Sequence, residues 1–177
     1  MRTYRDYFIA AATALLLAAC SGNPQQQEAA EQPEPSTDQA EKPVAAKQNT
    51  VGDVVSGYLA LKDALVASNA ENAQARAVDL LDVVDATKMP DVQQRVKEMA
   101  AATELEMQRT YFDSLSVALY DLVKEQTAGQ QTLYKQYCPM AFDNRGAFWL
   151  SANREIQNPY FGDEMMECGR VEEEMSL

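Results

Sequence analysis

The chain is 177 residues long and acidic, with 15 Lys and Arg against 27 Asp and Glu, a formal net charge of −12 and no histidine. Such a charge repels phosphate backbones and anionic lipid, so it argues against nucleic acid as a partner. Without histidine the chain lacks the usual nucleophile triad and a histidine general base, and its sequence has no Gly-rich phosphate loop. We therefore expect a protein that is not an enzyme.

The N-terminus has the pattern of a secretory signal. Basic residues precede an apolar run over residues 7–17, and small residues follow. About a dozen apolar residues fall short of the ~20 that cross a bilayer. The letters LAAC at residues 17–20 resemble the bacterial lipobox, whose cysteine is lipidated and becomes the first mature residue. The sequence predicts a signal peptide over residues 1–19, lipid attachment at Cys20, and a mature protein anchored to a membrane of the cell envelope and lying in the periplasm.

The stretch that follows Cys20 differs from the rest of the chain in composition. Up to residue 49 it consists largely of Gln, Glu, Pro and Ala, with almost no aliphatic side chains. Such a segment buries too little apolar surface to fold, so residues 20–49 are predicted to be a disordered linker behind the lipid. The folded domain is expected over residues 51–175.

Residues 51–99 show the apolar spacing of three helices. Thr50 and Asp53 predict a capped start for the first helix, and a turn at Ser68-Asn69 precedes the second. Pro90 suits the first position of the third helix. The apolar positions of the three segments are Val51, Val54, Val55, Tyr58, Leu59, Leu65 and Val66, then Val78, Leu80, Leu81, Val83 and Val84, then Val92, Val96 and Met99.

A fourth helix is predicted to complete the bundle. Thr103 and Glu106 have the spacing of a capping box, and Gly129 is expected to end the helix. Four helices joined by short connections favour an up-and-down four-helix bundle over residues 51–129, so the fold class is mainly α.

Residues 130–175 predict a small aromatic-rich α+β lobe. Turn residues at 143–146 and at Asn158-Pro159 rule out a long helix here. The segments 132–141 and 147–151 are typical of the two arms of a β-hairpin, and residues 163–168 suit a short helical turn. We expect this lobe to pack across one end of the bundle.

Four sulfur-bearing side chains of the lobe form a candidate metal site. On a strand, Cys138 and Met140 share a face, and on a helical turn Met165 and Cys168 share one, so the two pairs can converge. Thiolate and thioether sulfurs are soft donors that suit Cu(I). Zinc is less well served, because a site of two cysteines and carboxylates without histidine is uncommon for structural zinc.

A second interpretation needs no metal. Cys138 and Cys168 are the only cysteines left once Cys20 is lipidated, and cysteine pairs of exported proteins usually form disulfides. Closing a loop of about 30 residues stabilises a fold by roughly 3 to 4 kcal/mol. Met140 and Met165 then pack against the aromatic rings, where methionine fills gaps well. Free thiols are expected for a copper site and an intact bridge for the alternative.

The lobe also carries motifs that resemble a known bacterial family. They are YCPMA at 137–141, GAFWLS at 146–151, IQNPYFGD at 156–163 and MMECG at 165–169. These motifs resemble domain-of-unknown-function family 3347, which is found in exported lipoproteins and appended to periplasmic adaptor subunits of copper and silver efflux pumps. Members often carry a histidine in the helical region, which this chain lacks.

The resemblance implies a periplasmic domain linked to heavy-metal handling, with Cys138, Met140, Met165 and Cys168 at the matching positions. Taken with the soft-donor chemistry, we expect a lipoprotein that binds Cu(I) or Ag(I) in metal homeostasis or efflux, with heavy-metal efflux components as partners. The alternative is an envelope interaction module that binds no metal and contains a structural Cys138–Cys168 disulfide.

Overall fold

The structure is a computed structural model that describes residues 50–125 and 131–176. The predicted signal peptide, the lipidated Cys20 and the linker up to residue 49 lie outside the described residues, and so does Gly129 as the predicted end of the fourth helix. Within the part of the chain that the structure describes, no helix is both long and apolar enough to cross a membrane.

The first three helices begin where the sequence predicts. Helix α1, Val51–Val66, starts with a complete capping box: the Thr50 hydroxyl accepts from the Asp53 amide at 3.2 Å, and the Asp53 carboxylate accepts from the Thr50 amide at 2.9 Å. Helix α2, Ala70–Leu81, is capped by the side chain of Asn69. Helix α3, Pro90–Ala101, has its proline in the first turn, where a missing N–H leaves no bond unmade.

Helix α4, Leu105–Lys124, starts differently from the prediction. Its N-cap is Glu104, which makes no side-chain cap bond, so the predicted Thr103–Glu106 capping box is wrong. The helix begins one residue later than that box requires, and the Glu106 carboxylate accepts from Arg109 at 3.2 Å instead. The last helical residue is Lys124, five positions before Gly129.

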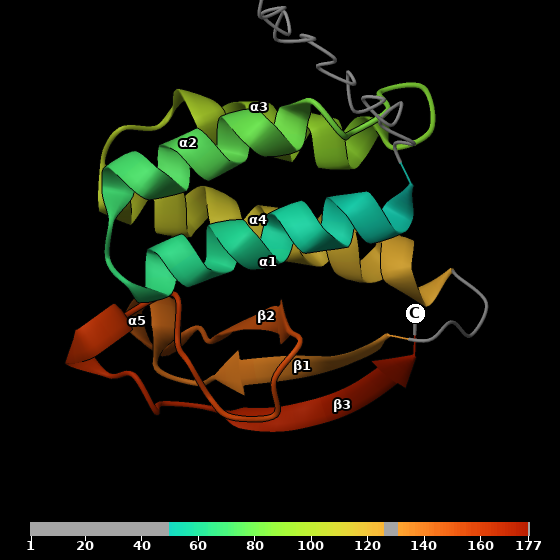
Figure 1. Cartoon of the computed structure of the whole chain (residues 1–177). Coiled ribbons are helices and arrows are strands. Elements are labelled where there is room, and N and C mark those ends of the chain that lie inside the picture. Colours follow the sequence, from blue (N-terminus) through green and yellow to red (C-terminus); the bar gives the residue numbers. More distant parts are fainter. Residues whose placement is uncertain (1–49, 126–130, 177) are drawn as a thin grey trace, which may run out of the picture. The chain divides into compact units, whose positions relative to one another are not determined.

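The four helices form the predicted up-and-down bundle. Each helix packs on the next in the chain, and α4 also returns to α1. In Figure 1, α2 and α3 form one layer and α1 and α4 the layer beneath it. The side chains that fill the space between them are mostly aliphatic. The fully buried ones include Val54, Leu61, Leu65, Leu80, Val96, Met99, Leu115 and Leu119.

The C-terminal lobe is built on a three-stranded antiparallel sheet in the order β2-β1-β3. Strands β1, Thr132–Cys138, and β2, Ala147–Ser151, are the arms of the predicted hairpin. Strand β3, Arg170–Ser176, pairs with the other side of β1 and was not predicted. Three consecutive glutamates in β3 hide its two-residue alternation, which only Val171 and Met175 carry.

Two turns of the lobe depart from the predicted backbone. The first hairpin arm ends at Cys138 and not at residue 141, because the chain enters the short segment α5, Ala141–Asn144, whose last three residues have positive φ. Cys138 and Met140 therefore do not share a strand face. The predicted helical turn at 163–168 is reduced to a 3₁₀ turn η1, Gly162–Glu164, and Met165 already has a non-helical backbone.

The lobe lies along the α1–α4 layer, so the expectation that it covers one end of the bundle is wrong (Figure 1). Its contacts run from Arg109 in the first turns of α4 to Lys124 in the last, and they include the Tyr58 hydroxyl in the middle of α1. Strand β2 explains this placement, because it packs against α4 and buries Trp149 and Leu150 completely. The sheet thus acts as a third layer.

Candidate functional site

Cys138 and Cys168 meet at one end of the sheet. Cys138 is the last residue of β1, and Cys168 lies two residues before β3, which pairs with β1. Their sulfur atoms are 2.7 Å apart. Cys138 is completely buried and Cys168 half-buried. The antiparallel pairing of β1 and β3 therefore brings together two cysteines that are 30 residues apart in the sequence.

The surroundings of Cys168 favour its protonated form. Burial, then the hydrogen bond and the charge of Cys138, raise the pKa of the Cys168 thiol to about 11, while the backbone amide of Met140 acts in the opposite direction. A thiol with this pKa carries its proton at neutral pH. An ion that binds there has to displace that proton, so its affinity rises with pH.

A buried asparagine fixes the loop that carries Cys168. The Asn158 side-chain amide donates to the carbonyl oxygen of Cys168 at 2.8 Å, and its side-chain oxygen accepts from the amide of Tyr160 at 2.8 Å. The backbone amide of Asn158 donates to the carbonyl oxygen of Met166 at 2.9 Å. Since Asn158 is completely buried, these bonds hold the segment that ends at Cys168 in one conformation.

Arg109 of α4 joins the bundle to the same loop. Its guanidinium donates to the carbonyl oxygen of Pro159 at 3.1 Å, to Glu106 at 3.2 Å and to the hydroxyl of Ser68 at 3.1 Å. The side chain is only 6% exposed, so its charge depends on these three partners. Gly162 packs against the same contact at a φ of +57°, and a Cβ there would meet the hydroxyl of Ser68 and, at 2.9 Å, the carbonyl oxygen of Val66.

Met140 and Met165 both line a pocket of about 420 Å³. Its wall comes from the start of α4, from the turn after β1 and from the loop before η1, and the two methionines line it with Glu106, Arg109 and Asp143 among others. Met140 is 48% exposed, whereas Met165 is half-buried. The adjacent Met166, which the sequence leaves as core or surface, is half-buried and is not among the residues that line this pocket.

Aromatic rings pack beside the pocket of the two methionines, which Phe142 and Tyr160 also line. Tyr160 contacts Phe142 at 5.3 Å, Trp149 at 5.9 Å and Phe112 at 6.0 Å between ring centroids. Its hydroxyl donates to the carbonyl oxygen of Phe148 at 2.6 Å. The Trp149 indole N–H is buried without a hydrogen-bond partner, so Trp149 serves here as an apolar anchor.

The four sulfur residues thus form two adjacent sets, the cysteine pair at the sheet end and the methionine pair beside the pocket. Within residues 50–125 and 131–176, no three or more His, Cys, Asp or Glu side chains gather into a group that could hold a metal ion. A soft ion bound there would therefore take a thioether, in addition to the two cysteines, to complete its set of ligands.

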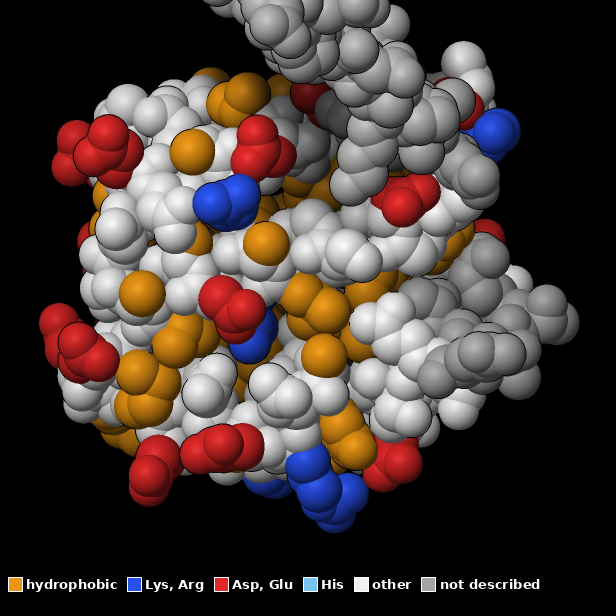
Figure 2. All heavy atoms as spheres, in the orientation of Figure 1, with side chains coloured by type: hydrophobic (Ala, Val, Ile, Leu, Met, Phe, Trp, Pro, Cys, Tyr) orange, Lys and Arg blue, Asp and Glu red, His pale blue; other side chains and the backbone are white. Residues whose placement is uncertain are grey.

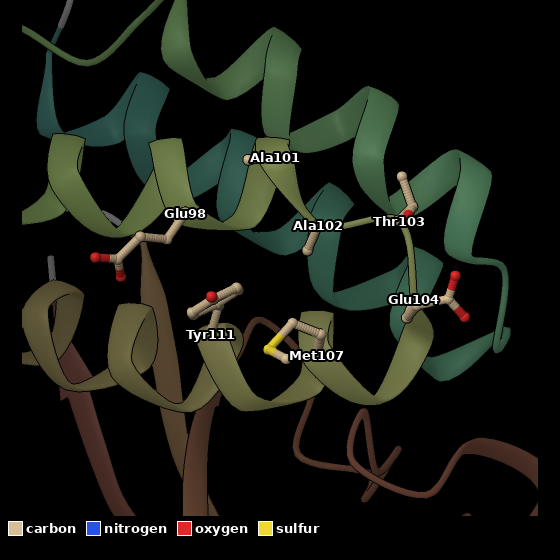
Figure 3. Close-up of a pocket in the computed structure, with 7 residues that line it drawn as sticks. All are labelled: Glu98, Ala101, Ala102, Thr103, Glu104, Met107 and Tyr111. Atoms are coloured by element: carbon tan, nitrogen blue, oxygen red, sulfur yellow. The ribbon is translucent and has the colours of Figure 1, made fainter.

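Another pocket of about 410 Å³ lies between the end of α3 and the start of α4. Figure 3 shows Met107 and Tyr111 projecting from α4 into this space, with the carboxylates of Glu98 and Glu104 near its two ends. Met107 supplies the one sulfur among its lining residues. This pocket lacks the donors that distinguish the C-terminal site.

Acidic side chains are spread over the surface that Figure 2 shows, with small hydrophobic areas between them. Several acidic side chains of the described residues are paired, whether or not they lie on this face. Asp113 pairs with Arg145 at 2.8 Å, and Glu173 accepts from Lys124 at 2.7 Å and from the Tyr120 hydroxyl at 2.7 Å. Hydrogen bonds from these two partners lower the pKa of Glu173. The negative net charge favours the approach of cations in general.

Sequence reasoning missed the two residues that hold the site, Arg109 and Asn158. Arg109 precedes the buried Phe112 by three residues and so lies on the same face of the helix, and this is the signal that could have found it. The Asn158 side chain bonds across ten residues to Cys168, and no local pattern predicts such a bond.

Two known protein families match parts of the chain. Residues 54–131 match DUF3347, a family of proteins of unknown function. The suspected family is therefore confirmed over the helical region, and the match ends before the sulfur motifs at 137–169. Residues 15–80 match a second family, the Rz1-like lysis system protein LysC. No curated protein and no solved structure matches the chain.

Proposed function

We propose that this chain is a lipoprotein of the bacterial cell envelope whose C-terminal lobe binds a soft monovalent metal ion, Cu(I) or Ag(I). The observation that carries the proposal is that Cys138 and Cys168, 30 residues apart in the sequence, bring their sulfur atoms to 2.7 Å, while Met140 and Met165, each within three residues of one of these cysteines, line one pocket. Soft sulfur ligands select such ions over harder divalent ones. We expect no catalytic activity, and we expect components of heavy-metal efflux to deliver or accept the ion.

The envelope location is supported by two features of the N-terminal region. The lipobox ends at Cys20, and the match to the Rz1-like lysis system family runs across this residue. We expect Cys20→Ala to abolish incorporation of a labelled fatty acid and to release the protein from the membrane fraction. A variant that is still labelled and still sediments with membranes would contradict the lipoprotein assignment.

The donor set fits the ion, and binding requires one local movement. Metal–thiolate bonds are about 2.3 Å long, so two sulfurs that share an ion in a tetrahedral arrangement lie about 3.8 Å apart. The present separation of 2.7 Å is about 1 Å shorter than that. Cys168 is half-buried, so the proposal requires its side chain to turn away from the buried Cys138 while its backbone keeps the bond to Asn158.

The same distance supports a second candidate, an interaction module held by a disulfide. A disulfide needs a sulfur–sulfur distance of about 2.05 Å, so only a small movement joins Cys138 to Cys168. The bond would tie the start of β3 to the end of β1. The lobe would then dock on an envelope partner without a metal.

The deciding experiment combines a thiol count with metal competition. The mature chain, reduced and kept anaerobic, is titrated with Cu(I) against a coloured chelator. We expect one tightly bound ion, no binding by the double variant Cys138→Ser and Cys168→Ser, and no change in Met166→Leu, the neighbouring thioether outside the pocket. Absence of binding by the reduced wild type, together with no free thiols in the protein isolated from the periplasm, would overturn the metal site in favour of the disulfide module.

A further inference from the structure

We propose that the pocket beside the start of α4 is the entrance for the soft cation, and that Met140 is its first ligand before the ion reaches the cysteine pair. This inference rests on the proposed function and adds to it a route and an order of ligands. It assigns Met140 a role in the rate of loading, whereas Cys138 and Cys168 determine the affinity.

The exposure of the four sulfur residues supports this order. Met140 is 48% exposed, Met165 and Cys168 are half-buried, and Cys138 is completely buried. Met140 and Met165 both line the pocket, and the backbone amide of Met140 lies against the thiol of Cys168. An ion that arrives from solvent therefore meets Met140 first and has the cysteine pair next to it.

The rim of the pocket suits a cation. Glu106 and Asp143 line the pocket and are exposed, and the Glu106 side chain is 88% exposed. Arg109, also in the wall, is buried, and its charge is offset by Glu106 at 3.2 Å. The carboxylate of Asp143 is then left to attract a positive ion toward the mouth of the pocket.

The turn that follows Met140 lines the pocket, and its backbone is held in one conformation by the surrounding side chains. Phe142, Asp143 and Asn144 all have positive φ, which is unfavourable for Phe142 and better tolerated by Asp and Asn. The ring of Phe142 is fixed by Tyr160 at 5.3 Å and by the guanidinium of Arg145 at 4.9 Å. Backbone conformations of this kind persist where the surroundings hold them, and they concentrate at ligand sites.

The transfer is a ligand exchange without oxidation or reduction. The ion first bonds to the thioether of Met140, which has no proton to lose. Bonds to the sulfurs of Cys168 and Cys138 then form as each thiol releases one proton to solvent, and the bond to Met140 breaks. Met165, which is less exposed and lines the same pocket, remains available as a ligand of the bound ion.

Stopped-flow mixing of the reduced mature chain with a coloured Cu(I)–chelator complex tests the route. For Met140→Leu we expect the second-order rate constant for transfer to fall at least tenfold, while the affinity at equilibrium changes less than threefold. Met107→Leu is the matched control, because Met107 is 47% exposed but lies beside the other pocket. We expect it to leave both quantities unchanged.

Asp143→Asn tests the rim separately, because asparagine tolerates the left-handed backbone at this position. We expect a two- to threefold slower transfer at low salt that disappears at high salt, with unchanged affinity.

Equal transfer rates for Met140→Leu and wild type would overturn the entrance and leave the metal site standing. A loss of affinity as large as the loss of rate would also overturn the proposed order, because it would make Met140 a ligand of the final site. If the reduced wild type binds no Cu(I) at equilibrium, the proposed function itself fails. The equilibrium titration therefore separates the two failures.

Discussion

The helical region and the C-terminal lobe reach a buried core by different means. In α1 to α4 the buried side chains are mostly aliphatic and recur at helical spacing, and the backbone polar groups are satisfied within each helix. In the lobe, loops carry the chain between short strands, and buried side chains such as Asn158 hold the backbone in place. Local rules determine the first region, whereas contacts between distant residues determine the second.

The two regions also differ in what they offer chemically. The aliphatic interior of the bundle has little to bind an ion, while the lobe holds the cysteine pair and the pocket with two methionines. The match to DUF3347 covers residues 54–131 and hence the region without these groups. The difference shows that similarity over the helices says little about the site, which has to be judged from the geometry of the lobe.

The largest expected effect comes from removing the aromatic anchor of the lobe. Trp149 is completely buried, so Trp149→Ala should lower the free energy of unfolding by about 3 to 5 kcal/mol. In native-state hydrogen exchange, the exchange rates of backbone amides should rise mainly in the strands. Leu80→Ala in α2 is the matched control. We expect it to lower the free energy of unfolding by about 2 to 5 kcal/mol and to raise amide exchange rates mainly in the helices. If each variant raised the exchange rates equally in the helices and in the strands, the two regions would open as one unit.

Alkaline pH should weaken the contact between the regions. Burial raises the pKa values of Tyr58 and Tyr160 above their usual range. A group that binds its proton more tightly when folded stabilises the fold below its unfolded pKa, and this stability is lost as the pH rises beyond it. The unfolding temperature should therefore fall above about pH 10, the ordinary pKa of tyrosine. Thermal melts of wild type and Tyr58→Phe should show a smaller fall in the variant.

At neutral pH, Tyr58→Phe should cost about 1 to 3 kcal/mol, because it leaves a buried amide without an acceptor. The Tyr58 oxygen accepts from the amide of Leu150 at 3.1 Å and lies 2.7 Å from the hydroxyl of Ser116, so it bonds α1 to both α4 and β2. Tyr120→Phe is the control: its hydroxyl bonds Glu173 in a more exposed place, and we expect a smaller loss. Urea denaturation measures the free energy of unfolding of both variants. Equal losses would show that the buried hydrogen bond of Tyr58 stabilises the fold no more than the more exposed one of Tyr120.

The smallest expected effect distinguishes two predicted helix caps. Thr50→Ala removes a cap that the structure forms, and we expect a loss of about 1 kcal/mol. Thr103→Ala removes one that the sequence predicts but the structure does not form, and we expect a change within about 0.5 kcal/mol. Urea denaturation of the two variants measures the difference. A comparable loss for Thr103→Ala would indicate that this side chain caps α4 in solution.

Much of the fold follows from the sequence, and the misses have physical causes. The predicted bundle, the predicted cap at Thr50, the proline at the first position of α3 and the predicted hairpin are confirmed. Strand β3 was missed because its glutamates mask the alternation, and the position of the lobe was missed because no local signal shows which helix face β2 will cover.

The candidate site divides in the same way. The residue types at 138, 140, 165 and 168 are a property of the sequence, and so is the soft character of their sulfur atoms. The prediction that Cys138 and Met140 point the same way requires a strand through Met140, and the same prediction for Met165 and Cys168 requires a helical turn through Cys168. The structure forms neither element. The cysteines meet through the pairing of β1 with β3, and Met140 and Met165 meet at a pocket that α4 helps to build.

Residue types and their spacing therefore account for the elements that depend on neighbouring residues, namely the helices with their periodic apolar faces and the two strands of the hairpin. The sequence by itself also determined which donors the lobe contains. Only the tertiary structure decided where these donors lie, because strand order, the layer that the sheet covers and the buried bonds of Arg109 and Asn158 arise between residues far apart in the chain. Local periodicity carries no information about contacts of that range.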